Sequence, residues 1–307
     1  MMAKCFKETA MLWLSEKRKY VKISTVCVYK ASLISHIIPW FDKAKSISEK
    51  DVQEFVLYKL ENGLSQKTVK DIVIIIKMIG KFARKNRIMK VEDFEVIYPK
   101  DFKKKRMEIL SRENERKLIE HLKANKTAKN IGLLICIGTG IRIGEICGLK
   151  WSDVDLELCE LNIQRTVQRV YLNNNKEKTR LIINEPKTIS SKRSIPLCKM
   201  LIGFLKPLKE YEKEQFYVLT DGNDPMEPRI YRNYFDSILK ELAIPKIKFH
   251  GIRHTFATRC IEASSDYKAI SSILGHSNIT TTLNLYVHPD SMQKQRCIEN
   301  MLKFLNC

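Results

Sequence analysis

The chain has 307 residues, enough for two domains with separate cores, and 55 Lys and Arg against 35 Asp and Glu give it a formal net charge of +20. Because both ends of the chain share this positive charge, it suits a polyanion that both domains touch, and nucleic acid is the commonest such partner. Nine scattered cysteines, without a C-x-x-C pair or a Cys/His cluster at zinc spacing, exclude a disulfide scaffold and a zinc domain and predict reduced thiols.

Two helical patterns open the chain. Residues 6–20 place apolar side chains on one side of a helix, and a second pattern runs from Thr25 to a stop at Pro39. Proline ends this prediction because it lacks the backbone N–H that a continuing helix would use.

Two further helices follow, each with a recognisable start. The hydroxyl of Ser48 can cap a helix together with Asp51 three residues later. From the cap Ser65, apolar residues recur at helical spacing up to Ala83, with lysines and arginines on much of the remaining surface. The four patterns predict a four-helix bundle over residues 1–90 with basic outer surfaces.

Residues 91–106 are predicted to link two domains. They contain Pro99 and end in the basic run Lys103-Lys104-Lys105-Arg106. That run suits a solvated hinge as well as a contact with a DNA backbone, and the sequence leaves both readings open.

The second predicted domain, residues 107–307, mixes helices with a small antiparallel sheet. Ser111 caps a helix that runs through Leu122. The remaining patterns are an apolar helix-turn-helix segment over 129–148, strands over 158–172 and 180–197, and helices from about 198 to the end. We therefore predict a mainly α protein, with a helical bundle followed by a mixed, mainly helical domain.

An arginine in an apolar neighbourhood is the first candidate for chemistry. Arg142 follows the turn Thr139-Gly140 and precedes Glu145 by three residues. A guanidinium among apolar residues needs an anion to offset its desolvation, and either Glu145 or a phosphate can serve. Taken alone, the pattern favours a structural Arg–Glu pair.

A denser group of polar residues follows later in the chain. His250 and Arg253 are three residues apart and would share one face of a helix, while His276 follows Leu274-Gly275 and Tyr286 comes ten residues later. Each is ordinary by itself, since a buried histidine or a tyrosine near a chain end usually serves packing. Together they supply what phosphoryl transfer from DNA requires: cations for the nonbridging oxygens, proton donors and acceptors, and a nucleophile.

The order and spacing of these residues resemble the signature of the tyrosine recombinase (phage integrase) family. The matching positions are Arg142, Glu145, His250, Arg253, His276 and Tyr286. The stretch 186–197 is similar to the family's β-hairpin, whose lysine aligns with Lys187, although Lys192 lies close enough to be a rival. Glu145, Asp153 and His254 are interpreted as packing or supporting residues.

The resemblance implies a mechanism and partners. Residues 1–90 would be a core-binding, SAM-like DNA-binding domain, and 107–307 a catalytic domain whose last segment, 291–307, docks on a neighbouring protomer. Arg142 and Arg253 would hold the scissile phosphate, with His276 as a hydrogen-bond donor. His250 would accept the proton of the nucleophile Tyr286, and Lys187 would protonate the leaving 5′-oxygen. No metal or other cofactor is expected.

The expected partners are double-stranded DNA, further copies of the chain in a synaptic tetramer, and an accessory directionality protein. We expect no partnership with a membrane, because no run of ~18 apolar residues and no leader-like start occurs, and we expect a cytoplasmic protein. The phrases 64–71 and 286–289 resemble integrases of phages and conjugative elements of Gram-positive bacteria. We expect no arm-site-binding domain, since the chain starts at the bundle.

Three alternatives stay open at this point. One is a resolvase of the Xer kind, and another is a type IB topoisomerase-like enzyme, which shares the chemistry but acts as a monomer. The third is a DNA-binding regulator without catalysis. Its expected mark is the loss of one or more of the six catalytic candidates, and this sequence keeps all of them: Arg142, Lys187, His250, Arg253, His276 and Tyr286.

Overall fold

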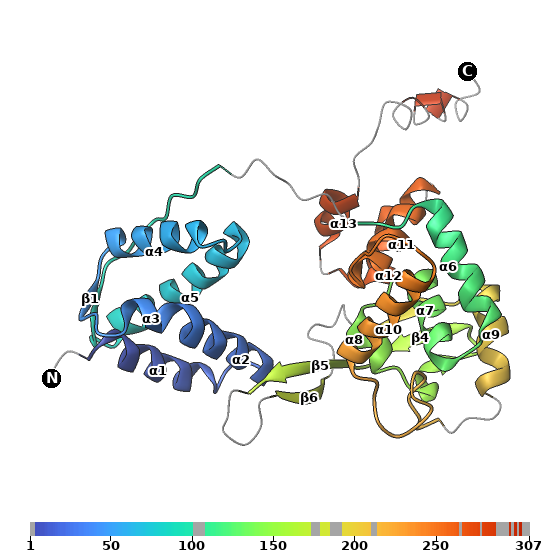
Figure 1. Ribbon diagram of the computed structural model, residues 1–307, viewed down its shortest axis with the longest axis horizontal. Helices are drawn as coiled ribbons and strands as arrows, with labels where there is room; N and C mark the ends of the chain where they lie inside the picture. The colour runs from blue at the N-terminus through green and yellow to red at the C-terminus, as the bar shows by residue number, and fades with distance from the viewer. Residues whose placement is uncertain are drawn as a thin grey trace. The chain divides into compact units, whose positions relative to one another are not determined.

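The computed structural model describes residues 4–100, 108–172, 179–184, 192–209, 214–263, 266–276 and 278–286, together with Gln295, Ile298, Glu299, Met301 and Leu302. The chain forms two compact units, Met1–Lys105 with Val170–Arg180, and Arg106–Arg169 with Leu181–Cys307 (Figure 1). In the described residues no helix is both long and apolar enough to cross a membrane.

The first unit is a helical bundle. Its elements are α1 (Phe6–Lys17), α2 (Ile23–Ser32), the π-helical turn η1 (Leu33–Ile37), α3 (Ile38–Phe41), α4 (Glu49–Glu61), α5 (Gln66–Lys85) and a parallel pair of short strands, β1 (Ser46–Ile47) and β2 (Lys90–Val91). Its core is built from side chains of all four helical segments, among them Phe6, Trp13, Phe41, Phe55 and Ile76. This agrees with the four predicted helical patterns.

The predicted helix starts at Ser48 and Ser65 are confirmed. The Ser48 hydroxyl accepts a hydrogen bond from the Asp51 N–H at 3.3 Å, and the Asp51 carboxylate accepts one from the Ser48 N–H at 2.8 Å. Ser65 accepts from the Thr68 N–H at 3.1 Å. Each cap satisfies a donor that the first turn of a helix leaves without an intrahelical partner.

The predicted stop at Pro39 is wrong, because helical structure continues to Phe41. The turn from Leu33 to Ile37 is π-helical, and the Ile38 N–H pairs with the Leu33 carbonyl five residues back. This wider turn places Pro39 in the first turn of α3. Proline is tolerated there because the N–H that it lacks has no partner within that new segment.

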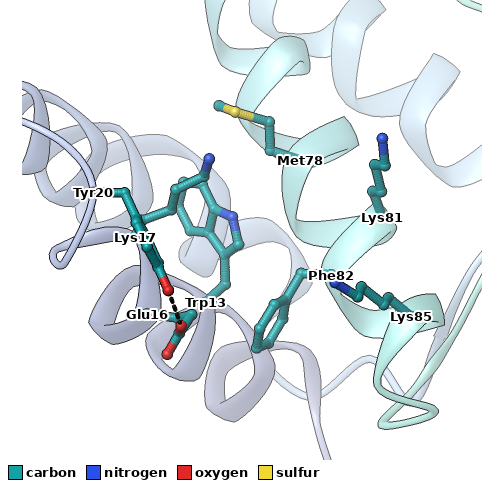
Figure 2. A pocket seen from close by; sticks show the side chains of 8 residues that line it. All are labelled: Trp13, Glu16, Lys17, Tyr20, Met78, Lys81, Phe82 and Lys85. Atoms are coloured by element: carbon teal, nitrogen blue, oxygen red, sulfur yellow. Dashed lines mark hydrogen bonds between the residues drawn. The ribbon is translucent and has the colours of Figure 1, made fainter.

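A groove lies between α1 and α5 of the first unit (Figure 2). It has a volume of about 250 Å³ and is lined by Trp13, Glu16, Lys17, Tyr20, Met78, Lys81, Phe82 and Lys85. Aromatic rings and a methionine form its apolar part, and lysines stand around them. The two lysines from α5 belong to the basic surface predicted for the fourth helix.

The described part of the predicted linker, residues 91–100, packs on the first unit. Val91 belongs to β2 and Phe94 is buried. The Gln53 side chain makes two hydrogen bonds of 3.0 Å with the backbone of Ile97, donating to its carbonyl and accepting from its N–H. These contacts fix the path of the chain as it leaves the bundle.

The second unit is mainly helical around a small sheet. Its helices are α6 (Arg112–Ala124), α7 (Ala128–Thr139), α8 (Ile143–Cys147), α9 (Lys199–Lys209), α10 (Pro228–Glu241), α11 (His250–Glu262), α12 (Tyr267–Leu274) and α13 (Ile279–Tyr286), with the 3-10 turn η2 (Trp151–Asp153). Its antiparallel sheet has the order β3 (Val154–Asp155), β4 (Glu160–Ile163), β7 (Arg193–Pro196). The predicted fold class is confirmed.

The two predicted long strands each divide in two. The first contains β4 and β5 (Thr166–Tyr171), and the second contains β6 (Thr179–Asn184) and β7. β4 pairs with β7, with Ile163 opposite Arg193, whereas β5 pairs with β6. The division matters for the site because β7 brings Arg193 to the side of α12.

Helix α7 lies at the centre of the second unit. Most of its residues are buried, and it packs against α6, α9 and α11. Its C-terminus at Gly140 and the start of α11 are thereby held side by side. These two points and the turn after α12 carry the candidate active site.

Candidate active site

Two left-handed glycine turns shape the site. Gly140 ends α7 and Gly275 ends α12, each with φ +64°. A Cβ atom at Gly140 would lie 2.6 Å from the Phe256 ring, and one at Gly275 would lie 3.0 Å from Cδ of Arg193. Both positions therefore need glycine for its backbone freedom and for the space that it leaves.

Arg253 joins the two turns. It lies in α11, its residue surface is only 2% exposed, and it donates from Nη1 to the Gly140 carbonyl at 2.9 Å and from Nη2 to the Leu274 carbonyl at 2.6 Å. Both acceptors lie at helix C-termini, where carbonyl groups carry partial negative charge. A buried guanidinium is thus held at the meeting point of α7, α11 and α12.

Arg142, the N-cap residue of α8, reaches the same turn. Its Nη2 donates to the Gly275 carbonyl at 3.1 Å, and its Nη1 donates to Oε1 of Glu145 at 2.8 Å. The Arg–Glu pair favoured from the sequence is present, yet 37% of the Arg142 side-chain surface is exposed. The guanidinium can therefore keep Glu145 as a partner and still meet an anion from solvent.

Two histidines complete the cluster. Nδ1 of His276 lies 2.9 Å from the buried Thr282 hydroxyl. The rings of His250 and His254 meet edge-on, with their centroids 4.6 Å apart. Protein atoms packed around the His276 ring, and then the charges of Arg253 and Arg142, lower its pKa to about 4. Burial, and then the charges of His254, Arg253 and Arg142, lower the pKa of His250 to about 4 as well. Both rings are therefore neutral at pH 7.

The lowered pKa of His276 predicts that acid destabilises the fold. Between about pH 6.5 and pH 4 the unfolded chain binds a proton at this position that the folded chain does not bind, so stability falls as the pH drops through this range. We expect a loss on the order of 1–3 kcal/mol in the free energy of unfolding. Urea unfolding at pH 7 and at pH 4.5 measures it.

Other groups also titrate in this range, so the control is His276→Gln. This variant should lose less stability between the two pH values than the wild type does. An equal loss in both proteins would contradict the assignment to His276.

The structure describes only some of the remaining predicted site residues. Tyr286 is the last residue of α13, four positions after Thr282, so the helix that carries the tyrosine is tied to His276 through the threonine hydroxyl. Lys187 lies outside the described residues. Lys192 is exposed and directly precedes β7. The structure brings together Arg142, His250, Arg253 and His276.

Two of the residues interpreted as packing or supporting residues, Glu145 and Asp153, form ion pairs. Glu145 is 5% exposed and accepts hydrogen bonds from Arg142 and Arg193. Burial alone would raise the pKa of Glu145, but hydrogen bonding and charge from Arg193, with the charge of Arg142, outweigh it and lower that pKa. Asp153 forms an ion pair with Arg165.

Arg193 is the residue that the sequence did not reveal. It stands 48 positions from Glu145 along the chain, and no spacing rule connects a strand residue with a helix that far away. The available signal was Glu145 itself, because a buried carboxylate needs more than one cationic or N–H partner.

Family descriptions match most of the chain. The description of the phage integrase family matches residues 108–293, and that of the phage integrase N-terminal SAM-like domain matches residues 5–60. A protein named Tyrosine recombinase XerC-like, from Caldanaerobacter subterraneus subsp. tengcongensis, is 30% identical over 92% of this chain and 75% of its own length. The transposase from transposon Tn916 of Enterococcus faecalis is 29% identical over 79% of this chain and 64% of its own length.

Solved structures share the fold. The Tn1549 transposon integrase in complex with a circular intermediate DNA is similar with a TM-score of 0.79 and 24% identity, covering 97% of this chain and 99% of that one. A lambda integrase tetramer bound to a Holliday junction gives a TM-score of 0.64 with 15% identity, covering 93% of this chain and 78% of that one.

Proposed function

Because the chain belongs to the phage integrase family and is a tyrosine recombinase, we propose that it integrates or excises a mobile element by cutting and rejoining DNA through a 3′-phosphotyrosyl link. The observation that supports this most is the placement of two guanidinium groups on adjacent carbonyls, Arg253 on Leu274 and Arg142 on Gly275, beside His276. Two arginines and a histidine gathered at one turn would together form a site for one phosphate.

In this proposal the arginines bind the nonbridging oxygens of the scissile phosphate. A guanidinium offers several N–H donors in a plane, so each arginine can keep its carbonyl and still donate to the phosphate. If the Thr282 hydroxyl donates to Nδ1 of His276, the neutral ring carries its hydrogen on Nε2 and can donate it as well. The negative charge that develops on the phosphate is thus met by fixed donors.

The bond changes follow from these roles. The oxygen of Tyr286 attacks phosphorus and gives its proton to neutral His250, while the bond from phosphorus to the 5′-oxygen breaks. The 5′-oxygen leaves with the electron pair and takes a proton from Lys187. Attack by a 5′-hydroxyl reverses the step, so the phosphoester is exchanged without hydrolysis and strand joining needs no ATP.

The same proposal covers partners and domains. Residues 1–90 and 107–307 would clasp double-stranded DNA, in keeping with the net charge of +20. The similar lambda integrase tetramer on a Holliday junction supports assembly of four copies on DNA. Ile298, Met301 and Leu302 are exposed by 59%, 49% and 41%, which supports docking of the last segment on a neighbouring protomer. An accessory directionality protein would bias the reaction.

A suicide substrate tests the proposal. Duplex DNA carrying the recombination site, nicked near the crossover, should trap a protein–DNA adduct that survives detergent and resists exonuclease from the 3′ end. Pairs of intact sites should exchange strands. Binding without any adduct would favour a regulator, and an adduct with DNA relaxation but no strand exchange would favour a topoisomerase-like enzyme.

A further inference from the structure

Arg193 makes a three-way contact in the candidate active site. Its side chain is 6% exposed, and Nη1 and Nη2 donate to the two oxygens of Glu145 at 3.1 Å and 3.0 Å. Its Nε donates to the Ile273 carbonyl at 2.6 Å. The residue thus presents the planar guanidinium fork to one carboxylate and one backbone carbonyl.

Glu145 is shared between two arginines. Oε1 also accepts from Nη1 of Arg142 at 2.8 Å, and Oε2 also accepts from the Arg142 backbone N–H at 2.8 Å. The carboxylate therefore fixes both the side chain and the backbone of Arg142. Arg193 in turn offsets the cost of holding that carboxylate, charged, in the protein interior.

The Ile273 contact extends a series. Arg193, Arg253 and Arg142 donate to the carbonyls of Ile273, Leu274 and Gly275, in that order along the chain. Arg193 comes from β7, Arg253 from α11 and Arg142 from the N-cap position before α8, and the next residue after this turn is His276. Gly275 lies close against Arg193, since an added Cβ there would be 3.0 Å from Cδ of Arg193.

We propose that Arg193 is a positioning residue for strand cleavage: through Glu145 it sets the Arg142 guanidinium, and through the Ile273 carbonyl it sets the turn that presents His276. This inference rests on the proposed function. In this role Arg193 acts through Glu145 and the Ile273 carbonyl, to which its Nε, Nη1 and Nη2 donate, and not by binding the phosphate.

The test is the single-turnover cleavage rate on the nicked substrate. Arg193→Ala should cleave about 10- to 100-fold more slowly, by analogy with supporting residues around other reactive centres, while the Kd for DNA changes by less than about threefold. The cleavage rate of Arg193→Lys should lie between those of the wild type and Arg193→Ala, because a lysine keeps the positive charge but cannot reproduce the guanidinium fork.

A pH profile separates positioning from mere structural support. Without Arg193 the buried Glu145 carboxyl should have a raised pKa, so cleavage by Arg193→Ala should increase with pH across an ionisation that the wild type does not show. Adding Glu145→Gln to Arg193→Ala should remove that step from the profile.

Arg165→Ala is the matched control. Arg165 also pairs with a buried carboxylate, Asp153, and also donates to a backbone carbonyl, that of Gly148, at 3.4 Å. Its loss should lower stability and leave the cleavage rate of the folded protein near that of the wild type, with circular dichroism at the assay temperature reporting the folded fraction.

The inference is overturned if folded Arg193→Ala cleaves at the wild-type rate, or if its profile shows no new ionisation. Absence of any adduct from the wild type would instead overturn the proposed function.

Discussion

Tyr286→Phe should abolish the covalent protein–DNA adduct and leave DNA affinity unchanged. The variant lacks only the hydroxyl oxygen that would attack phosphorus, and loss of a nucleophile lowers rates by at least about 10⁴-fold in comparable enzymes. The adduct formed on the nicked substrate after denaturation in detergent measures the first effect, and a mobility shift at matched salt measures the second.

Tyr267→Phe is the comparison. Tyr267 is an exposed tyrosine at the start of α12, one helix before the proposed nucleophile. It should give the adduct in normal yield. An adduct of normal yield from Tyr286→Phe would mean that another residue is the nucleophile.

Lys187→Ala should slow cleavage of ordinary DNA by about 10²- to 10⁴-fold, as expected for loss of a general acid. Replacing the bridging 5′-oxygen by sulfur gives a leaving group that needs no proton. The variant should therefore recover most of its rate on the sulfur-containing substrate. Cleavage rates on the two substrates, measured side by side, give the ratio that identifies the acid.

Variants of the arginines and of the rival lysine complete this experiment. Arg142→Ala and Arg253→Ala should stay slow on the sulfur substrate, since charge still develops on the nonbridging oxygens. Rescue of Lys192→Ala in place of Lys187→Ala would assign the acid to the other lysine. Rescue of neither would show that this stretch supplies no acid.

Local rules predicted the parts of the fold that depend on near neighbours. The caps at Ser48, Ser65 and Ser111 are confirmed because a hydroxyl and an N–H three residues apart are brought together by the helix itself. His250 and Arg253 lie together in α11, as their spacing predicted. The pairing of Arg142 with Glu145 is of the same kind.

Contacts between segments far apart in the sequence were harder to predict. The continuation past Pro39 depends on a π-helical turn that no residue pattern marked. Arg193 was missed because its partners are a carboxylate on another element and a main-chain carbonyl. The catalytic roles given to six residues stay predictions that the experiments above address: Arg142, Lys187, His250, Arg253, His276 and Tyr286.

The turn that gathers three arginines also says which substitutions this site can accept. The acceptors at Ile273, Leu274 and Gly275 are main-chain carbonyls, which every amino acid possesses. The side chains at positions 273 and 274 are constrained only by packing. Exchanges among apolar residues there should therefore leave the arginines in place. Any other residue at Gly275 should be destabilising, because its backbone is left-handed and an added Cβ atom would crowd the Arg193 side chain. Related sequences can thus differ at positions 273 and 274 and still keep the same backbone conformation at this turn.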